Sequence, residues 1–287
     1  MRTRKVEIFA FILPGLLFLI IFSLYPTLFT WYTSFRDFSI FSNNFNGLRN
    51  YFELFKDNVF YISLKNSLLY VIFAVGFEFI IGMLIALLFN QNFKGKSIAL
   101  IFIMLPMIIP PVVSALSFYM MYDPTLGLMN YILKNLFHIS GFSWLTDPKT
   151  AIWAVVLIDI WQWTPFVSLV LLAGLQYLPK ETLEAARIDG ANSIQIFFSI
   201  TIKLMRKIIM IALLFRTVEA FKAFESIFIT TKGGPGYNTR TLNIYAYIKG
   251  FEFMKFGEAA TLAILMLFVS SFLISIFRKF FSKEEIK

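Results

Sequence analysis

Six long apolar stretches constrain what this chain can fold into more than any other feature. Each is long enough to cross the hydrocarbon core of a bilayer as a helix, which takes about 20 residues. Hydrophobic residues make up 58% of the 287 residues and charged residues 15%, whereas soluble domains have roughly 45–50% and about 25%. The sequence therefore predicts an all-α polytopic membrane protein with a single transmembrane domain over residues 1–287. The expected spans lie at about 9–34, 67–89, 98–121, 151–175, 207–230 and 258–280.

The first stretch follows the basic segment "MRTRK", which is similar to the start of a signal peptide. The apolar run beyond it is roughly 25 residues long, whereas the hydrophobic region of a signal peptide has only about 7–15 residues. No small-residue cleavage site closes the run. We therefore expect this stretch to be a retained span.

An even number of spans places both termini on the same side of the membrane. If that side is the cytoplasm, 14 of the 26 Lys and Arg residues lie in the inner segments and 10 lie in the outer loops, although the inner segments are shorter. Positive charge concentrates on the cytoplasmic side of membrane proteins. The sequence thus predicts cytoplasmic termini, and this explains the net charge of +9 without a nucleic-acid partner.

The sequence lacks the usual catalytic and metal-binding patterns. It contains no cysteine and a single histidine, His138, whereas metal sites need clustered donors. The segment "KGKS" at 94–97 ends like a phosphate-binding loop, but Asn90 stands where that loop needs its first glycine. We expect no metal site, no cofactor and no enzymatic activity in this chain.

Six ionisable side chains fall within the expected spans. Each costs roughly 2.5–3.5 kcal/mol at the centre of a membrane helix, so they should face the bundle interior or a water-filled cavity. Four of them follow one another at intervals of three residues and alternate in sign, which lets neighbours pair along the helix. Either the fifth span lines a polar pathway for a solute, or the charges form internal pairs that hold the bundle together. The six are Glu78, Asp159, Arg216, Glu219, Lys222 and Glu225.

The fourth span contains the polar and aromatic segment "DIWQWTPF" at 159–166. Because Pro165 removes one backbone hydrogen bond, we expect the helix to kink or unwind near Gln162. A broken helix beside Trp161, Gln162 and Trp163 would suit a surface that faces a solute. The alternative for each tryptophan is an ordinary position at the bilayer interface, where this residue is common.

The segment "YLPKETLEAARIDGANSIQIFFSITIKLM" at 177–205 resembles the EAA loop of ABC importer permeases. Its Glu-Ala-Ala triplet begins at Glu184, and Gly190 and Ile200 follow at the family spacing, whereas Lys203 stands where the family usually has proline. In that family the loop forms two short cytoplasmic helices, and the first docks in a cleft of the ATPase subunit. The resemblance implies that the coupling residues are Glu184, Ala185, Ala186, Asp189 and Gly190.

Further segments extend the resemblance over nearly the whole chain. Residues 105–133 and 161–179 look like the carbohydrate-uptake branch of these permeases, and the turn within 221–247 is typical of the subunit related to the larger maltose permease. The resemblance implies the transmembrane fold of a type I ABC importer. Within it, a core five-helix region covers 67–280 and contains the 177–205 loop.

The resemblance also implies sugar-lining positions in the fourth and fifth spans, and the four in the fifth span share one helical face. These positions are Gln162, Trp163, Phe166, Arg216, Glu219, Ala220 and Ala223. The glycines and proline of "TKGGPGYNT" at 231–239 predict a tight irregular turn. By the resemblance, this turn faces an extracytoplasmic binding protein through Gly233, Gly234, Pro235 and Gly236.

The implied partners are a sister permease subunit, two ABC ATPase subunits and a solute-binding protein, in the cytoplasmic membrane of a bacterium or archaeon. The implied cargo is a sugar or oligosaccharide. An alternative is an ion- or proton-coupled secondary transporter, in which the charged fifth span would act as a relay. Such transporters often have repeated halves, and the sequence has no convincing internal similarity. A membrane-embedded enzyme is a third alternative, for which no catalytic constellation is present.

Overall fold

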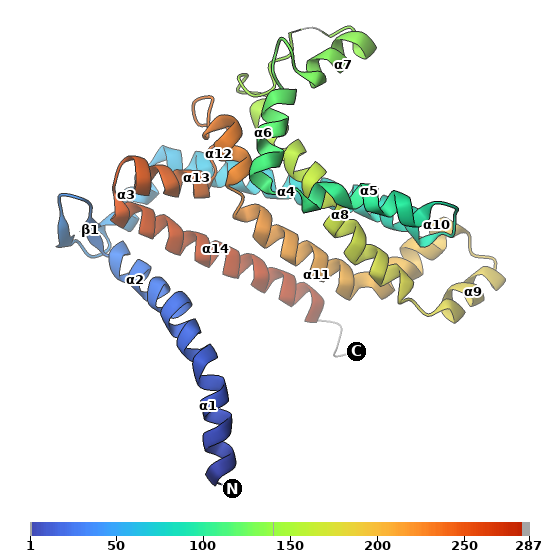
Figure 1. Ribbon diagram of the computed structural model, residues 1–287, viewed down its shortest axis with the longest axis horizontal. Coiled ribbons are helices and arrows are strands. Elements are labelled where there is room, and N and C mark those ends of the chain that lie inside the picture. Colours follow the sequence, from blue (N-terminus) through green and yellow to red (C-terminus); the bar gives the residue numbers. More distant parts are fainter. Residues whose placement is uncertain (1, 140, 283–287) are drawn as a thin grey trace. The chain divides into compact units, whose positions relative to one another are not determined.

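The computed structural model describes residues 2–139 and 141–282, and most of them are helical (Figure 1). The chain divides into two compact units. Unit 1 comprises the described residues up to Tyr61 together with Tyr245–Val269, and unit 2 comprises Ile62–Ile244 with the described residues from Ser270 onward. Three helices contain residues of both units: α4 (Asn58–Asn90), α13 (Leu242–Tyr247) and α14 (Phe256–Ser282).

Unit 1 begins with a continuous helical rod. It runs from α1 (Arg2–Leu19) through the π-helical turn η1 (Ile20–Leu24) into α2 (Tyr25–Ser34). A short hairpin follows, which pairs Arg36 with Phe45, Asp37 with Asn44 and Phe38 with Asn43 and leaves the predicted all-α class unchanged. The other elements of unit 1 are β1 (Arg36–Phe38), β2 (Asn43–Phe45), α3 (Arg49–Lys56) and η3 (Ile248–Glu252).

Unit 2 is built around α8, which packs against α5 and α11, while α12 packs against α6 (Figure 1). The elements of unit 2, besides those shared with unit 1, are α5 (Lys96–Ile108), α6 (Pro111–Met121), α7 (Leu128–Phe137), α8 (Ala151–Gln176), α9 (Lys180–Ile188), α10 (Ser193–Ile196), η2 (Phe197–Thr201), α11 (Ile202–Phe221) and α12 (Glu225–Thr231).

Within the described ranges, four helical segments are long and apolar enough to cross a membrane, and the α5–α6 pair makes a fifth if it is counted as one span. The predicted count of six is therefore not confirmed. The third predicted span is bent by 94° between α5 and α6. The fifth ends at Phe221 instead of near 230, and five charged residues make α11 less apolar than the other spans. The four segments are Phe11–Ser34, Asn58–Asn90, Ala151–Gln176 and Phe256–Phe277.

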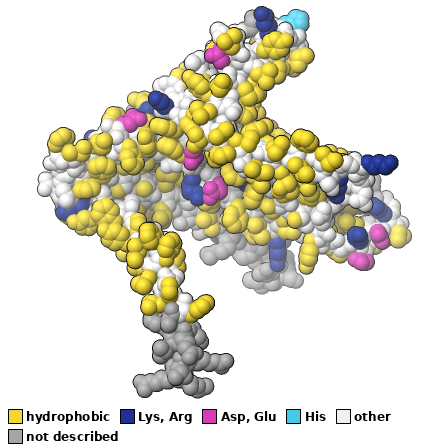
Figure 2. Space-filling model, viewed as in Figure 1, with side chains coloured by type: hydrophobic (Ala, Val, Ile, Leu, Met, Phe, Trp, Pro, Cys, Tyr) yellow, Lys and Arg dark blue, Asp and Glu magenta, His cyan; other side chains and the backbone are white. Residues whose placement is uncertain are grey.

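Large apolar side chains are exposed along these helices, and Figure 2 shows hydrophobic side chains over much of the visible surface. Phe22 is 66% exposed, Leu84 63% and Phe272 64%, on three different helices. In water such a surface would be unfavourable, whereas lipid chains cover it without penalty. The surface chemistry therefore fits a chain embedded in a membrane.

Small residues let the helices of unit 2 approach closely. A Cβ at Gly82 of α4 would lie 3.0 Å from Cγ1 of Val167 on α8, and one at Gly174 of α8 would lie 2.9 Å from Cγ2 of Ile208 on α11. Close backbone approach at small residues is typical of helix pairs in membranes. The contacts enclose an apolar core of Met83, Ala86, Phe89, Val167, Leu171, Leu172, Leu175, Met205 and Ile209.

The loop at 122–150 begins with a turn that is organised by Asp123. Its Oδ1 accepts hydrogen bonds from the backbone N–H of Leu126 at 2.8 Å and from the hydroxyl and backbone N–H of Thr125 at 2.7 and 2.9 Å. These bonds, the one from Leu126 most of all, hold the pKa of Asp123 below its ordinary value. The loop then enters the short helix α7.

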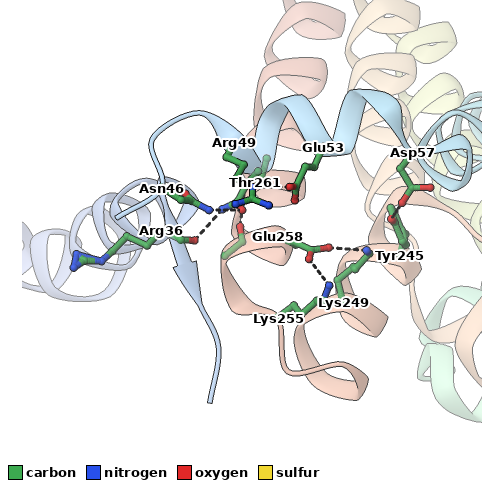
Figure 3. Close-up of polar contacts among 12 residues, drawn as sticks. Arg36, Asn46, Arg49, Glu53, Asp57, Tyr245, Lys249, Lys255, Glu258 and Thr261 are labelled. Carbon is green, nitrogen blue, oxygen red and sulfur yellow. Dashed lines mark hydrogen bonds and ion pairs between the residues drawn. The ribbon is translucent and has the colours of Figure 1, made fainter. Parts of the chain in front are cut away.

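Polar contacts fasten the hairpin and α3 of unit 1 to the start of α14. Asn50 Nδ2 donates to the backbone oxygens of Ser34 and Arg36, both at 2.9 Å, and Thr261 Oγ1 also donates to Ser34 O at 3.3 Å. In Figure 3, Lys249 and Lys255 point at Glu258, whose two carboxylate oxygens accept from them at 2.6 and 2.7 Å. Tyr245 points at Asp57 and donates a hydrogen bond to it.

The first turn of α14 requires a glycine at one position, and this is testable. A Cβ at Gly257 would lie 2.1 Å from the backbone oxygen of Arg36, whereas one at Gly76 of α4 would have no atom within 4 Å. We expect Gly257→Ala to destabilise the protein by about 1–3 kcal/mol, because the backbone must move. Gly76→Ala should be neutral or stabilising, because alanine is the better helix former.

Thermal unfolding of the two purified variants in detergent measures the difference. Equal melting temperatures for the Gly257 and Gly76 variants would show that α14 has room for a Cβ beside the backbone oxygen of Arg36.

Candidate functional site

The first helix break in unit 2 lies between α5 and α6. Pro110 and Pro111 lack a backbone N–H, and Ile109 before them is extended, with φ −72° and ψ 130°. The break leaves the backbone oxygen of Ile109 without a partner from its own helix. Nε2 of Gln162 on α8 donates to that oxygen at 3.0 Å. Gln162 therefore provides the hydrogen bond that the backbone oxygen of Ile109 lacks within its own helix. The sequence around Gln162 did not reveal this role.

A second break separates α11 from α12 at residues 222–224. Phe224 has a φ of −135°, and the backbone oxygen of Lys222 accepts a hydrogen bond of 2.7 Å from Nδ2 of Asn243. By contrast, α8 stays helical through Pro165, so of the predicted kink or unwinding near Gln162 the unwinding does not occur. The prolines at 110 and 111 and the segment after Phe221 interrupt their helices, whereas Pro165 does not.

The two breaks meet at one polar cavity of about 220 Å³. Non-helical backbone at membrane depth is tolerated only where it is buried in protein or lines a water-filled space. The cavity has room for several water molecules or for part of a hydrated solute. Its lining residues are Pro111, Asp159, Gln162, Trp163, Arg216, Glu219, Lys222, Ala223, Phe224, Glu225 and Ser226.

A buried ion triad closes the inner wall of this cavity. Arg216 on α11 donates from Nε and Nη2 to the two carboxylate oxygens of Glu78 on α4, at 2.6 and 2.8 Å, and from Nη2 to Asp159 on α8 at 2.8 Å. The Arg216 side chain is 2% exposed and that of Glu78 is fully buried. The triad joins three helices and contains two carboxylates for one guanidinium, so it holds a surplus negative charge when both are ionised.

The guanidinium carbon of Arg216 also lies 4.9 Å from the centre of the Trp163 ring, a cation–π contact. Trp163 is thus held by the triad on one side while it lines the cavity. Elsewhere in the lining, Lys222 Nζ lies 2.8 Å from Glu219 Oε1, and both side chains are about half exposed.

The predicted ladder of charges along the fifth span is therefore only partly present. Glu219 and Lys222 pair along the helix as expected, but Arg216 turns inward to Glu78 and Asp159 instead of pairing with Glu219. The inner charges bind helices together, as one interpretation expected. The outer charges line a polar cavity, and a pathway for a solute stays a prediction. The spacing could not reveal this, since it does not say which neighbours come from other helices.

Five of the predicted sugar-lining residues lie around the cavity: Gln162, Trp163, Arg216, Glu219 and Ala223. Two are not among its lining residues. Phe166 packs against the apolar core of unit 2, and Ala220 is buried. The prediction did not include Asp159, Lys222 and Glu225, although all three had stood out as charges within apolar spans.

The EAA segment forms an elbow of two helices, α9 and α10, as the resemblance implied. Gly190 has a φ of +84°, and its N–H donates to Arg187 O at 3.1 Å while that of Ala191 donates to Ala186 O at 3.0 Å. This is the Schellman ending of α9, and it favours glycine at position 190. Asn192 and Gln195 then form a reciprocal capping box that starts α10.

The elbow is open to its surroundings. Glu184, Ala185, Asp189 and Gly190 are exposed and Ala186 is half-buried. The elbow also carries large exposed apolar side chains, since Ile188 is 86% exposed and Ile194 70%. An exposed patch of apolar and charged groups is typical of a surface that meets a partner.

At Lys203, where the family usually has proline, the helix is not interrupted. α10 continues through the π-helical turn η2 into α11, and Lys203 is exposed near the start of α11. A lysine keeps the backbone N–H that a proline would lack, so this continuity is permitted.

The predicted tight turn after α12 is confirmed. Gly233 and Gly236 have φ values of +86° and +59°, and a Cβ at Gly233 would meet Ile244 at 2.9 Å. Thr239 Oγ1 donates to Gly234 O at 2.7 Å and also contacts the hydroxyl of Thr231 at 2.7 Å. The turn is therefore held in one conformation, with Gly236 and Tyr237 exposed at its tip.

A larger cavity of about 430 Å³ in unit 2 has a different character. It is lined mostly by apolar and aromatic side chains, among them Phe77, Ile81, Trp153 and Leu157. Such a surface suits lipid chains better than a hydrated solute. Of these two cavities of unit 2, the polar one between the helix breaks is the candidate site for a polar solute.

The surplus carboxylate of the triad leads to a prediction. Arg216→Gln should destabilise the protein by about 3–5 kcal/mol, because it leaves Glu78 and Asp159 buried without a cation. Glu78→Gln should cost about 1 kcal/mol or less, because Asp159 still neutralises Arg216 and the amide oxygen still accepts a hydrogen bond. Denaturant unfolding of the purified protein in detergent compares the two. If the two variants lost the same free energy of unfolding, the triad would not hold one carboxylate more than Arg216 needs.

Three comparisons relate the chain to known proteins. It is 34% identical over 256 residues to the trehalose/maltose transport system permease protein MalF of Thermococcus litoralis, covering 88% of this chain and 86% of that one. It is 33% identical over 260 residues to the sulfoquinovosyl glycerol transport system permease protein SmoG of Agrobacterium fabrum, covering 90% and 84%. The fold matches a chain of a bacterial alginate ABC transporter, crystallised with an alginate-bound periplasmic protein, with a TM-score of 0.84 at 21% identity and coverage of 96% and 93%.

The model of one protein family matches most of the chain. This family is described as "Binding-protein-dependent transport system inner membrane component", and the match covers residues 78–286, which include the elbow and the cavity. The chain therefore belongs to this family, as a membrane-embedded permease subunit of an ABC importer and not itself an enzyme.

Proposed function

We propose that this permease subunit forms one half of the translocation path for a sugar or oligosaccharide in an ATP-driven importer. The observation that carries the proposal is the polar cavity at the two helix breaks, in a unit whose other large cavity is apolar. Carboxylates and an indole ring suit a sugar, whose hydroxyls donate hydrogen bonds and whose C–H faces pack on aromatic rings. Relatives named as permeases for trehalose, maltose and sulfoquinovosyl glycerol support this cargo class.

The proposed assembly contains a sister permease, two ABC ATPase subunits and a solute-binding protein. The exposed elbow at α9 meets the ATPase in the cytoplasm, with Glu184 pairing with a basic side chain of that partner. Both termini are then cytoplasmic, and the turn at 233–236 faces the binding protein outside. The exposure of the elbow and the rigidity of the turn support these assignments.

A continuous helix connects the elbow with the cavity. From Ser193 to Phe221 the chain is helical without a break, through α10, η2 and α11, which is about 40 Å at 1.5 Å per residue. Arg216 and Glu219 lie near the far end of this helix. A displacement of the elbow by the ATPase subunits would therefore move one wall of the cavity as a rigid body.

The relatives and the family model do not support an ion-coupled secondary transporter, because they belong to transport systems of the ABC and binding-protein-dependent kind. In the proposed importer the energy comes from partner subunits. The charges of α11 then serve to hold helices and to line the cavity, without a relay of protons.

The role of the cavity leads to a prediction about its volume. Ala223 is half-buried in the lining, whereas Ala173 on α8 is exposed and outside it. Ala223→Trp should reduce ATP-driven sugar uptake at least tenfold by filling the cavity, and Ala173→Trp should leave uptake near the level of the unchanged protein. The assay is uptake into proteoliposomes that contain the complete transporter. If the Ala223 variant took up sugar as fast as the unchanged protein, the translocation path would not pass through this cavity.

The role of the elbow leads to a second prediction with a matched control. Gly190 and Gly95 both have positive φ values, +84° and +85°, and a Cβ at either would meet no atom within 4 Å. Valine imposes similar backbone strain at both positions. Gly190→Val should abolish the coupling between sugar uptake and ATP hydrolysis, whereas Gly95→Val should retain it. Sugar-stimulated ATPase activity of the reconstituted complex reads this out, and equal losses would indicate a general effect of strain.

A further inference from the structure

The charges around the cavity are unbalanced. Three carboxylates line it, those of Asp159, Glu219 and Glu225, against two cations, Arg216 and Lys222. Glu78 adds a fourth carboxylate directly behind Arg216. The space that a solute enters therefore lies in a negative potential if these groups have their usual charges.

Both cations already have a carboxylate partner. Arg216 is 2% exposed and is already bound to two carboxylates. Lys222 is more exposed, but its ammonium lies 2.8 Å from Glu219. A sugar carboxylate, phosphate or sulfonate would therefore compete with a carboxylate that each cation already binds.

One carboxylate is open. Glu225, at the start of α12, is exposed, and it has no ion pair among the residues that the structure describes. Its oxygens can accept hydrogen bonds from the hydroxyls of an uncharged sugar, and hydrogen bonds to an ionised acceptor are the stronger kind. The same oxygens repel an anion, because like charges brought together cost several kcal/mol in affinity.

We propose that this cavity selects uncharged sugars and rejects sugar acids. The proposal rests on the proposed function, in which the cavity is the translocation site. Selectivity then arises from the unpaired Glu225 and from the pairing of Lys222 with Glu219, which leaves the cavity without a free cation. The shared fold does not decide this property, because it resides in side chains.

The test compares each neutral sugar with its own acid. Trehalose, maltose and maltotriose are offered to proteoliposomes containing the complete transporter with its binding protein, beside their terminal uronic-acid derivatives. We expect the unchanged transporter to take up the acid at less than about one tenth of the rate of the neutral sugar. Equal uptake of an acid and its neutral counterpart would overturn the proposal.

Permease variants separate the cavity from the binding protein, because the same binding protein serves all of them. Glu219→Gln frees the Lys222 ammonium, and Glu225→Gln removes the open carboxylate. Each should raise the acid-to-neutral uptake ratio on the order of tenfold, with the acid uptake of each variant measured against its own neutral uptake. Glu252→Gln is the control, because Glu252 is an exposed carboxylate outside the cavity lining, and it should leave the ratio unchanged.

The outcomes distinguish this inference from the proposed function. If the unchanged transporter moves none of the sugars in an ATP-dependent manner, the proposed sugar cargo fails. If it moves neutral sugars but the ratio is the same in the Glu219, Glu225 and Glu252 variants, sugar import stands and the charge selection in this cavity is wrong.

Discussion

The guanidinium of Arg216 makes the contact on which the rest of unit 2 depends. It binds carboxylates from α4 and α8 with three hydrogen bonds of 2.6–2.8 Å, and its side chain is almost completely buried. Charges in such surroundings lose their hydration, so they are tolerated only with close, well-directed partners. Three helices are thereby fixed relative to one another at one point. Because Arg216, Asp159 and Trp163 also line the cavity, the same contact determines the shape of its inner wall.

The polar cavity of this domain lies where two helices are broken. At each break, a side-chain amide donates a hydrogen bond to the backbone oxygen that the break leaves unpaired. Gln162 satisfies the backbone oxygen of Ile109, and Asn243 satisfies that of Lys222. Without such partners, each exposed carbonyl would cost several kcal/mol in an apolar environment. Gln162 thus both binds the backbone at the α5–α6 break and lines the cavity. A substitution of Gln162 therefore changes both the break and the cavity.

The elbow shows the opposite relation between sequence and structure, because local chemistry explains nearly all of it. Gly190 ends α9 in a left-handed conformation, and Asn192 with Gln195 starts the next helix. These interactions lie within a few residues of one another and need no distant contact. A rigid elbow followed by an unbroken helix from Ser193 to Phe221 is suited to transmit a displacement, since a flexible connection would absorb it.

The sequence by itself determined the features that depend on local chemistry: the apolar helices, the elbow, the tight turn at 233–236 and the presence of charges within the membrane. The capping box at Asn192 was also visible there, although it was not predicted. Tertiary structure alone decided which charges meet, because Arg216 had a possible partner three residues away at Glu219 and instead binds carboxylates 138 and 57 positions distant. It also decided where helices break. Pro165 is accommodated within α8, whereas the segment after Phe221, which has no proline, breaks and is satisfied by Asn243 from another part of the chain. Which charges pair and which helices break depend on partner residues that tertiary packing brings close. A local sequence pattern does not identify those partners.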